Sequence, residues 1–280
     1  MSTNPSERTP ATAVSTAPSR GARLTRYGLW QLRDFFIDRG IGLIVIGVLL
    51  GYLTISPELP RLHANIAALP PKLIVKWGGM AGATAMMMKD FNEMFLRKFL
   101  GGMVFVGAVL AMNGIVANDR RLGYYRFLFT KPLAPWRYYG QAFVINTLGF
   151  ATVITLLGAV YGGLVWPILS GRLLLVVTLM FVMYAGVTFL LSAAARWDWL
   201  SLVTVAVAST FFWERYQDSP AVLAKLLYFL PPLHRTNEVY KALAMAEPLP
   251  WPLVEWYAGY GIACFVAGLV VLRYRRLAIV

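Results

Sequence analysis

The chain has 280 residues, of which 58% are hydrophobic and only 14% are charged; soluble domains carry about 25% charged residues, so this composition excludes an ordinary soluble globular protein and indicates a membrane protein. The net charge of +13 would also suit a nucleic-acid-binding protein, but basic residues beside membrane spans explain it better. The single cysteine, Cys264, lies in an apolar run, which excludes a disulfide framework and a thiolate metal site.

The chain begins with a polar segment, residues 1–24, that is rich in Ser, Thr, Pro and Ala. We expect it to be a disordered cytoplasmic tail, because it has no apolar run to bury. It does not have the pattern of a secretory signal, since the first apolar run begins only at Gly40.

Residues 25–39 place most apolar side chains on one helical face and most charged side chains on the other. Trp30 and Phe36 belong to the apolar set, and Arg33 belongs to the charged set. The pattern predicts an amphipathic helix that lies in the membrane interface and leads into the first span. The alternative is a frayed basic flank of that span, because the segment is short for a periodicity argument.

Six apolar runs are candidates for membrane-spanning helices. They are residues 40–55, 99–118, 141–165, 173–195, 199–213 and 256–272. The fifth run reaches only about 22 Å at 1.5 Å per residue, so it needs the flanking Trp197 and Tyr216, or irregular structure after it. We therefore expect an all-α polytopic membrane protein with a six-span domain over residues 40–272, followed by a short cytoplasmic tail, residues 273–280.

Two segments are expected on the outer side of the membrane. Residues 73–88 are apolar but contain Lys76 and three glycines, and counting them as a span would place the basic ends of the chain on opposite sides, so we predict a re-entrant or interfacial helix. Within residues 214–250, the run 221–230 is followed by two prolines, which predicts two short re-entrant helices before the sixth span, forming an extracellular gate. A plain amphipathic surface loop is the alternative for this second segment.

Basic residues set the orientation of the spans. They gather before the first span, in the loop after the second and behind the last, whereas Arg172 stands alone between the third and fourth. Because Lys and Arg are enriched in cytoplasmic loops, both termini and the loop after the second span are predicted to be cytoplasmic.

That loop, residues 119–141, is the most distinctive segment of the chain: DRRLGYYRFLFTKPLAPWRYYGQ. It combines five basic residues, two prolines and seven aromatic side chains between two charge-free runs. Residues 124–130 are too polar for lipid and too aromatic for a linker, so they predict a contact surface. The alternative is that Arg120, Arg121 and Arg137 only fix the topology and that the aromatic residues lie at the membrane interface.

Several chemistries have no support in the sequence. It lacks a G-x-x-x-x-G-K-[ST] phosphate loop, so the chain does not bind ATP in that manner by itself. The predicted spans hold no Asp, Glu, Lys or Arg, which ion-driven carriers usually need, and no catalytic constellation, so we expect no enzyme. His63 and His234 have no paired ligands, and the methionine cluster from Met86 fits packing better than copper binding, so we predict no metal.

Three features of the chain occur together: a basic helix before the first span, a second span that ends in Asp119-Arg120-Arg121, and the sequence GYYRFLFTKPLAPWRYYG over residues 123–140. In this arrangement the chain resembles the ABC-2-type permease family of ATP-binding-cassette exporters. Members of that family have six spans, and their loop between spans two and three carries acidic and basic residues, Gly, an apolar pair and Pro before Arg and Tyr. The likeness extends over the whole chain in topology. Residues 56–98 depart from it, because this segment is longer than in compact members.

The resemblance implies ATP hydrolysis on a separate ATP-binding-cassette subunit, a second permease copy or a homologue, and a bacterial cytoplasmic (inner) membrane with its lipids, with no cofactor and no nucleic acid. It also implies that a short coupling helix in the loop docks into the ATPase, beside an interfacial helix that carries Trp30, Arg33 and Phe36. The residues expected at this contact are Arg120, Arg121, Tyr124, Tyr125, Phe127, Leu128, Phe129, Pro132, Trp136 and Arg137.

A membrane scaffold or assembly subunit without transport activity is the second hypothesis, since it would share the composition and could dock through the same loop. A neighbouring reading frame with a phosphate-loop lysine would favour the exporter, and one that encodes complex subunits would favour the scaffold. The substrate is less constrained, although an uncharged cleft suits an amphiphile, a lipid-linked molecule or a hydrophobic drug better than a small ion. Polar residues of spans two and three either line a mildly polar path or hydrogen-bond between helices: Asn113, Asn146, Thr147, Thr152 and Thr155.

Overall fold

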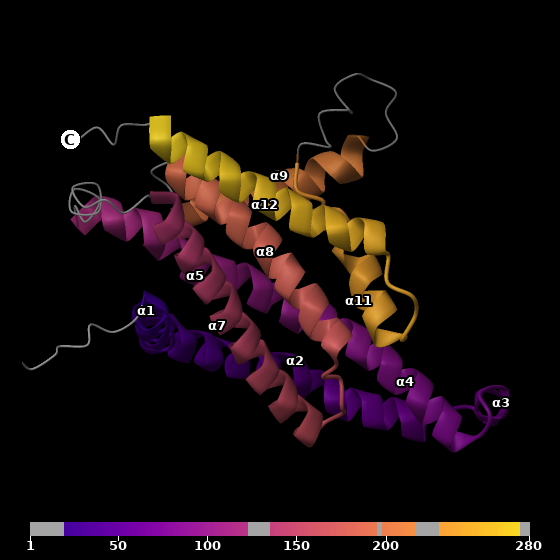
Figure 1. Cartoon of the computed structure of the whole chain (residues 1–280). Helices are drawn as coiled ribbons and strands as arrows, with labels where there is room; N and C mark the ends of the chain where they lie inside the picture. Colours follow the sequence, from indigo (N-terminus) through magenta and orange to yellow (C-terminus); the bar gives the residue numbers. More distant parts are fainter. Residues whose placement is uncertain (1–19, 123–134, 195–197, 217–229, 275–280) are drawn as a thin grey trace, which may run out of the picture.

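A computed structural model describes residues 20–122, 135–194, 198–216 and 230–274. Within these ranges the chain is helical and contains no strand (Figure 1). The all-α prediction is therefore confirmed.

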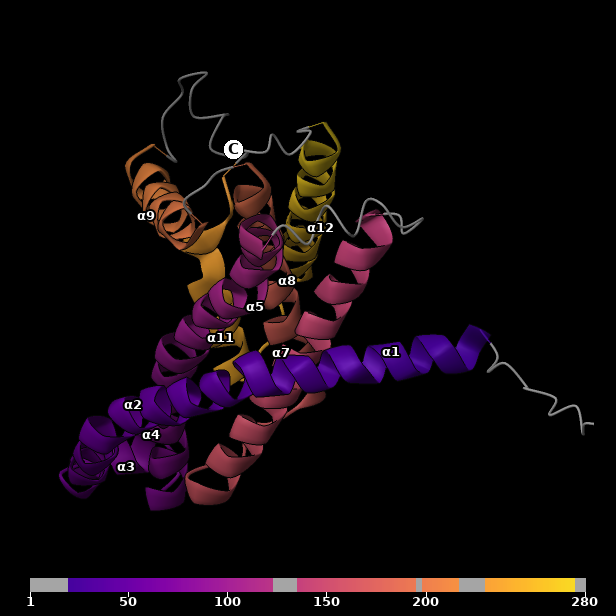
Figure 2. The ribbon, with the colours of Figure 1, turned by 90° about the vertical axis from the view of Figure 1, so that its left-hand side faces the viewer.

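One long rod opens the described chain. It consists of α1 (Arg20–Phe35), the π-helix η1 (Phe36–Gly40) and α2 (Ile41–Ala67). Phe35, Gly40 and Ile41 all have right-handed helical φ and ψ angles, so no break separates the three parts. Figure 2 shows this rod passing across α7 (Pro135–Leu164), and the two contact each other along α1, η1 and α2.

The helix bounds of this rod differ from two of the expected boundaries. The helix already begins at Arg20, inside the segment expected to be disordered up to residue 24. At the other end α2 continues to Ala67, twelve residues beyond the expected end of the first span at residue 55. Pro57 and Pro60 lie inside α2; each removes one backbone donor, but the proline φ angle is compatible with a helix, so the helix continues through them.

The segment expected as one outer helix, residues 73–88, is divided between two helices. α3 (Pro71–Lys76) ends at a turn in which Gly78 and Gly79 have φ angles of 77° and 99°, a backbone conformation that favours glycine. α4 (Met80–Phe95) then starts a helix that runs through η2 (Leu96–Leu100) into α5 (Gly101–Leu122). The second half of the segment is thus the beginning of the helix that contains the second span, and the prediction of one re-entrant or interfacial helix was wrong.

The remaining helices follow α7 in order. They are α8 (Gly171–Ala194), α9 (Asp198–Tyr216), the 3-10 helix η4 (Leu233–Arg235), α11 (Thr236–Ala244) and α12 (Trp251–Tyr274). In Figure 1 the end of α5, the start of α7 and the end of α12 lie at the left, near α1, whereas α3, the start of α4 and α11 lie at the right. The predicted cytoplasmic ends of the helices thus gather on one side of the molecule.

α8 is the central helix, packed against α5, α7, α9 and α12. Its contact with α12 is unusually close, because a Cβ atom on Gly186 would collide with the backbone carbonyl of Gly261, and one on Gly261 would collide with the backbone at Val182 and Met183. Small residues that bring two helix backbones together in this way are typical of helix pairs in membranes.

Five described helical segments are long and apolar enough to cross a membrane: Gly28–Ala67, Met80–Met112, Trp136–Leu164, Gly171–Ala194 and Trp251–Tyr274. They indicate an integral membrane protein. α9 is not among them, since its last turn carries Glu214 and Arg215. A sixth span therefore stays a prediction.

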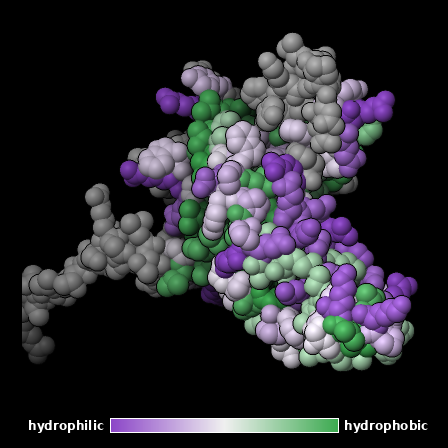
Figure 3. Space-filling model, turned by 90° about the vertical axis from the view of Figure 1, so that its right-hand side faces the viewer, coloured by the Kyte–Doolittle hydropathy of each residue, from purple (hydrophilic) through white to green (hydrophobic). Residues whose placement is uncertain are grey.

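The region before α12 is described from residue 230 onward, so most of the expected helix over residues 221–230 lies outside the described residues. After Pro231 and Pro232, η4 and α11 pack against α9, α4 and η2. Arg235 donates two hydrogen bonds of 2.8 Å to the carboxylate of Glu238, and this bonding raises the pKa of the guanidinium. Figure 3 looks onto this end of the molecule, where hydrophilic residues cover the centre of the view and an apolar band runs beside them.

Candidate functional site

The predicted partner-binding loop is described only at its two edges. Arg120 and Arg121 lie in the last turn of α5, while Trp136 and Arg137 are exposed in the first turn of α7. The described helices extend into both edges of the predicted loop, and residues 123–134 between them lie outside the described residues. Six predicted contact residues lie outside the described residues: Tyr124, Tyr125, Phe127, Leu128, Phe129 and Pro132.

Two exposed pairs of tryptophan and arginine lie on α1 and at the start of α7. The guanidinium Cζ of Arg33 lies 5.4 Å from the ring centroid of Trp30, and that of Arg137 lies 5.1 Å from the ring centroid of Trp136. α1 and α7 contact each other directly. Exposed cation–π pairs contribute about 0.5–1 kcal/mol, so their main consequence is a surface that is both aromatic and positively charged.

The amphipathic helix is anchored to the helix bundle at its C-terminal end. Phe35 is only 3% exposed and makes an edge-to-face contact with Phe36 at 5.5 Å. Its ring occupies the space beside Gly149 of α7, where a Cβ atom would collide with it. Leu29 and Trp30, further from the junction, are exposed. The face predicted to lie in the membrane interface is therefore exposed at Leu29 and Trp30, whereas Phe36 of the same face is half-buried against the helix bundle and Phe35 fixes the helix to α7.

Arg39, in η1, connects three helices. Its Nη1 donates a hydrogen bond of 2.8 Å to the carbonyl oxygen of Ala111 in α5 and one of 2.9 Å to Oδ1 of Asn146 in α7. Asn146 is 3% exposed, and its own Nδ2 donates to the carbonyl of Ala142 at 2.7 Å. Hydrogen bonds from a charged donor are about twice as strong as neutral ones, so this junction is a firm contact between the first rod and both helices that flank residues 123–134.

The role of Arg39 was not predicted, because the sequence places it among basic residues that fix the topology. In the predicted spans, Asn146 lies five and Ala111 seven residues from the cytoplasmic ends, which corresponds to about 7–10 Å of helix. A long arginine side chain at that depth normally extends towards the interface or pairs with polar groups. The signal available in the sequence was Asn146, an amide in an otherwise apolar run.

The threonines of the third span bond within their own helix. Thr147, Thr152 and Thr155 each donate their hydroxyl to the backbone carbonyl four residues earlier in α7. Asn113 belongs to α5, but the position of its side chain lies outside the described part of the chain. Of the two possibilities weighed for these residues, hydrogen bonding within and between helices is the one that the threonines and Asn146 fulfil.

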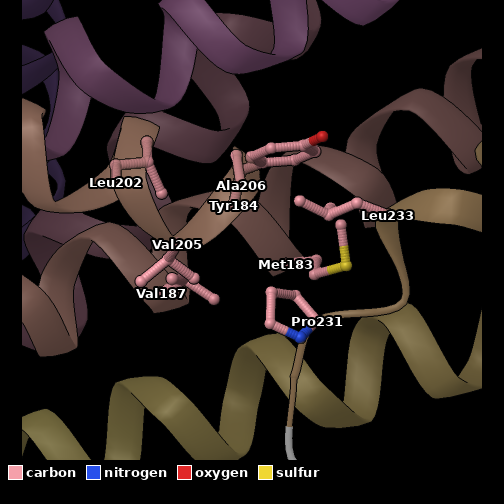
Figure 4. A pocket seen from close by; sticks show the side chains of 8 residues that line it. All are labelled: Met183, Tyr184, Val187, Leu202, Val205, Ala206, Pro231 and Leu233. Atoms are coloured by element: carbon pink, nitrogen blue, oxygen red, sulfur yellow. The ribbon is translucent and has the colours of Figure 1, made fainter. Parts of the chain in front are cut away.

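A groove separates α9 from α8. It is a shallow, open groove of about 490 Å³ that is lined mostly by apolar side chains, with Thr210 and Glu214 on α9 and the hydroxyl of Tyr184 as its polar groups. A small cavity of about 10 Å³ continues from it, and both share Tyr184, Ala206 and Leu233. Figure 4 shows this cavity, with side chains of α8, α9 and the segment around Pro231 pointing towards one another around it. Ser209 fixes α9 to this segment by donating to the carbonyl of Pro231.

Metal binding finds no support in the described ranges, where no group of three His, Cys, Asp or Glu side chains could hold an ion. His63 is exposed on α2, and the side chain of His234 is not among those described. No protein-family model matches the chain, and a comparison with curated proteins finds no similar sequence. The functional argument therefore depends on the geometry of this molecule.

Proposed function

We propose that the chain is the membrane-spanning permease subunit of an ATP-binding-cassette exporter of the ABC-2 type, which moves its substrate with energy from ATP hydrolysis on a separate subunit. The six spans of this proposal are α2, the helix from α4 to α5, α7, α8, α9 and α12. Both termini and residues 123–134 are cytoplasmic, in agreement with the gathering of the corresponding helix ends on one side of the molecule (Figure 1).

The contact of Arg39 with Ala111 and Asn146 is the observation that carries the proposal. A permease driven from outside needs a rigid connection between the loop that contacts the ATPase and the spans that move. Residues 123–134 are bounded by α5 and α7, and Arg39 binds one residue of each. A displacement of this loop would therefore displace the rod formed by α1, η1 and α2 as well.

The exposed aromatic and basic side chains support the same proposal. Trp30 with Arg33 lies on α1, and Trp136 with Arg137 lies at the start of α7, a helix that contacts α1. Aromatic residues and arginine are enriched in the centres of protein interfaces. An ATPase subunit that bound the loop would meet this surface beside it.

The groove between α8 and α9 supports an amphiphile as the substrate. The groove has a volume of about 490 Å³ and is open at the surface of the helix bundle, so an amphiphile in the membrane would have direct access to it. Apolar side chains form most of its wall, while Thr210 and Glu214 lie on the part of α9 that leads to its charged end. An apolar tail in the groove and a polar head near Glu214 would match this distribution.

Large apolar side chains remain exposed along the spans and suit lipid or a second permease copy. On α2 they are Ile41, Val45, Val48, Leu49, Tyr52 and Leu53, and on α9 they are Val207, Phe211 and Phe212. ATP-binding cassettes close as pairs, so the proposal requires two such chains, identical or homologous.

Co-purification tests the proposal. The tagged chain is isolated from its native membrane in mild detergent, and the co-purifying proteins are identified by mass spectrometry. We expect a soluble subunit with a phosphate-loop lysine, whose ATP hydrolysis in proteoliposomes changes when this chain is present. Recovery of respiratory or other complex subunits in its place, or ATP hydrolysis by the isolated chain, would overturn the permease assignment and favour the scaffold.

A further inference from the structure

A second cavity lies at the opposite end of the molecule from residues 123–134. It encloses about 280 Å³ between α4, the segment joining α7 to α8, the start of α8 and the end of α11. The lining side chains used in the argument are Lys89 and Asn92 of α4 and Trp166 and Ser170 of the joining segment. The Arg39 junction and the groove along α9 share none of these residues.

Hydrogen-bond donors dominate the polar lining of this cavity. Lys89 is the one charged group among the described residues that line it. Only 5% of Asn92 is exposed, and its Oδ1 accepts a hydrogen bond of 3.0 Å from the hydroxyl of Tyr161. This bond occupies the acceptor of the amide and leaves its Nδ2 donors for the cavity.

The N-terminus of α8 adds positive potential. Ser170 precedes this 24-residue helix, and its Oγ accepts a hydrogen bond of 3.2 Å from the backbone N–H of Leu173. The first backbone N–H groups of a helix carry a partial positive charge that favours anions. An ammonium group, a buried amide and a helix N-terminus therefore meet at one cavity.

The walls of the cavity are fixed by contacts outside its polar lining. Arg172, at the start of α8, donates to the carbonyl oxygen of Glu247 beyond α11. Ala246, one of the lining residues, has a φ angle of 57°, a left-handed conformation that is unfavourable for alanine. Such strained residues gather at binding sites, where the surrounding structure holds them.

We propose that this cavity binds a phosphate-type oxyanion, supplied either by a lipid headgroup or by a soluble phosphate. A volume of 280 Å³ is just below the usual range for whole ligands, so it suits a phosphate group and its immediate substituents. Lys89 pairs with the negative charge, Nδ2 of Asn92 and the hydroxyl of Ser170 donate hydrogen bonds to its oxygens, and the N-terminus of α8 adds positive potential. The site does not depend on the chain being a permease.

Binding of defined probes to the purified full-length chain in a non-ionic detergent tests the site. The probes are inorganic phosphate, short-chain phosphatidic acid, and diacylglycerol of the same chain length, which lacks the phosphate. Titration calorimetry compares the wild type with Lys89→Gln, Ser170→Ala and the matched control Lys72→Gln, which removes an exposed lysine of α3 that does not line the cavity.

We expect phosphatidic acid but not diacylglycerol to bind the wild type. Lys89→Gln should weaken binding about tenfold or more, because it removes a charge-assisted hydrogen bond, while Ser170→Ala should weaken it less and Lys72→Gln should not change it. Binding of inorganic phosphate with the same dependence on Lys89 assigns the site to soluble phosphates, and its absence assigns the site to lipid. Equal affinity of the wild type and Lys89→Gln, or no binding of either anion by the wild type, would overturn the proposal.

Discussion

Arg39 and Asn146, 107 positions apart in the chain, are joined by a 2.9 Å hydrogen bond from Nη1 to Oδ1. The bond ties the helix that precedes the first span to the helix that follows residues 123–134. Its two partners have quite different sequence contexts, since Arg39 belongs to a row of basic residues and Asn146 to an apolar run.

Asn146→Leu should destabilise the protein, because Arg39 loses one charged hydrogen bond inside the bundle. Hydrogen bonds to charged groups contribute about 1.5–3 kcal/mol, so a clear fall in the thermal midpoint in detergent is expected. Thr152→Val is the control, as Thr152 is exposed and bonds only within its own helix. Equal midpoints for the two variants would show that the junction contributes nothing to stability.

The same substitution separates stability from coupling. In the proposed complex, Asn146→Leu should reduce transport-coupled ATP hydrolysis more than it reduces the amount of ATPase bound, because residues 123–134 still dock while α5 and α7 are less firmly connected to α2. ATP hydrolysis per assembled complex gives this comparison. A parallel loss of binding and hydrolysis would place the defect in assembly.

Gly186→Ala should be severely destabilising, since the added Cβ collides with the backbone carbonyl of Gly261 and a backbone cannot rotate away as a side chain can. Overpacking of this kind costs about 1–3 kcal/mol or more. Gly259→Ala on α12 is the matched control, because no atom lies within 4 Å of its Cβ position. It should be neutral or slightly stabilising, as alanine favours a helix by about 1 kcal/mol over glycine. The thermal midpoints of the two variants in detergent test this difference, and equal midpoints would contradict the close contact of α8 with α12.

Gly149→Ala should loosen the anchor of α1, because its Cβ would collide with the ring of Phe35. The ring belongs to a side chain, so a second substitution, Phe35→Leu, should restore the contact in part. Proteolysis within residues 20–35 measures the release of the helix. Gly140→Ala is the control, because no atom lies within 4 Å of its Cβ position, and this variant should be cleaved at the same rate as the wild type. If Gly149→Ala is also cleaved at the wild-type rate, the contact of Phe35 with Gly149 does not anchor α1.

The sequence predicted the helical membrane protein well, because long charge-free runs have few other structures available to them in lipid. It predicted element ends poorly where local signals conflict with helix continuity. The charge-free run that ends at residue 55 suggested the end of the first span, whereas α2 continues to Ala67, and the second half of the expected outer helix over residues 73–88 is the start of the helix that continues into α5. Gly78 and Gly79, read only as weakening a span, are the actual break.

The contacts of the candidate site also differ in how far the sequence could predict them. Single residues with strong local chemistry, such as Trp30 with Arg33, are visible in sequence because their partners are nearby. Two other contacts are not visible in the sequence, because each joins residues at least 69 positions apart. They are the contact of Arg39 with Ala111 and that of Asn92 with Tyr161. The cavity at Lys89 depends on three separate stretches of the chain, residues 85–96, 166–173 and 243–246, and no spacing rule within one stretch could indicate it.

The topology is testable with single cysteines in a Cys264→Ala background. Positions 63 and 238 should react with an impermeant maleimide on intact cells, because residue 63 lies in the outer part of α2 and residue 238 lies in α11, on the outer side before the sixth proposed span, and position 126 should react only after permeabilisation. His63 and Glu238 are both exposed, so burial would not prevent labelling there. Labelling at position 126 but not at 63 would invert the proposed orientation.

Phe127→Asp tests whether residues 123–134 dock the ATPase. If Phe127 enters an apolar socket of the partner, a carboxylate there should cost a few kcal/mol and abolish co-purification, while insertion is retained because the residue lies outside the spans. The double change Arg120→Glu with Arg121→Glu is the control, which should disturb topology or lipid contact instead. If the Phe127→Asp variant co-purifies with as much ATPase as the wild type does, residues 123–134 serve only to fix the topology.

The groove between α8 and α9 gives the last prediction. Ala206 lines both the groove and the small cavity beside it, so Ala206→Phe should fill space that a substrate tail would occupy. Thr204→Phe adds the same side chain at an exposed position of α9 that lines neither. In proteoliposomes that contain the ATPase partner, we expect Ala206→Phe to lower transport of an amphiphilic probe several-fold, as a blocked pocket loses most of the burial that binds an apolar tail. Basal ATP hydrolysis should be retained, because the groove lies away from α1 and the start of α7. Equal transport by both variants would remove the groove from the substrate path and direct the search to the surfaces of α2 and α7.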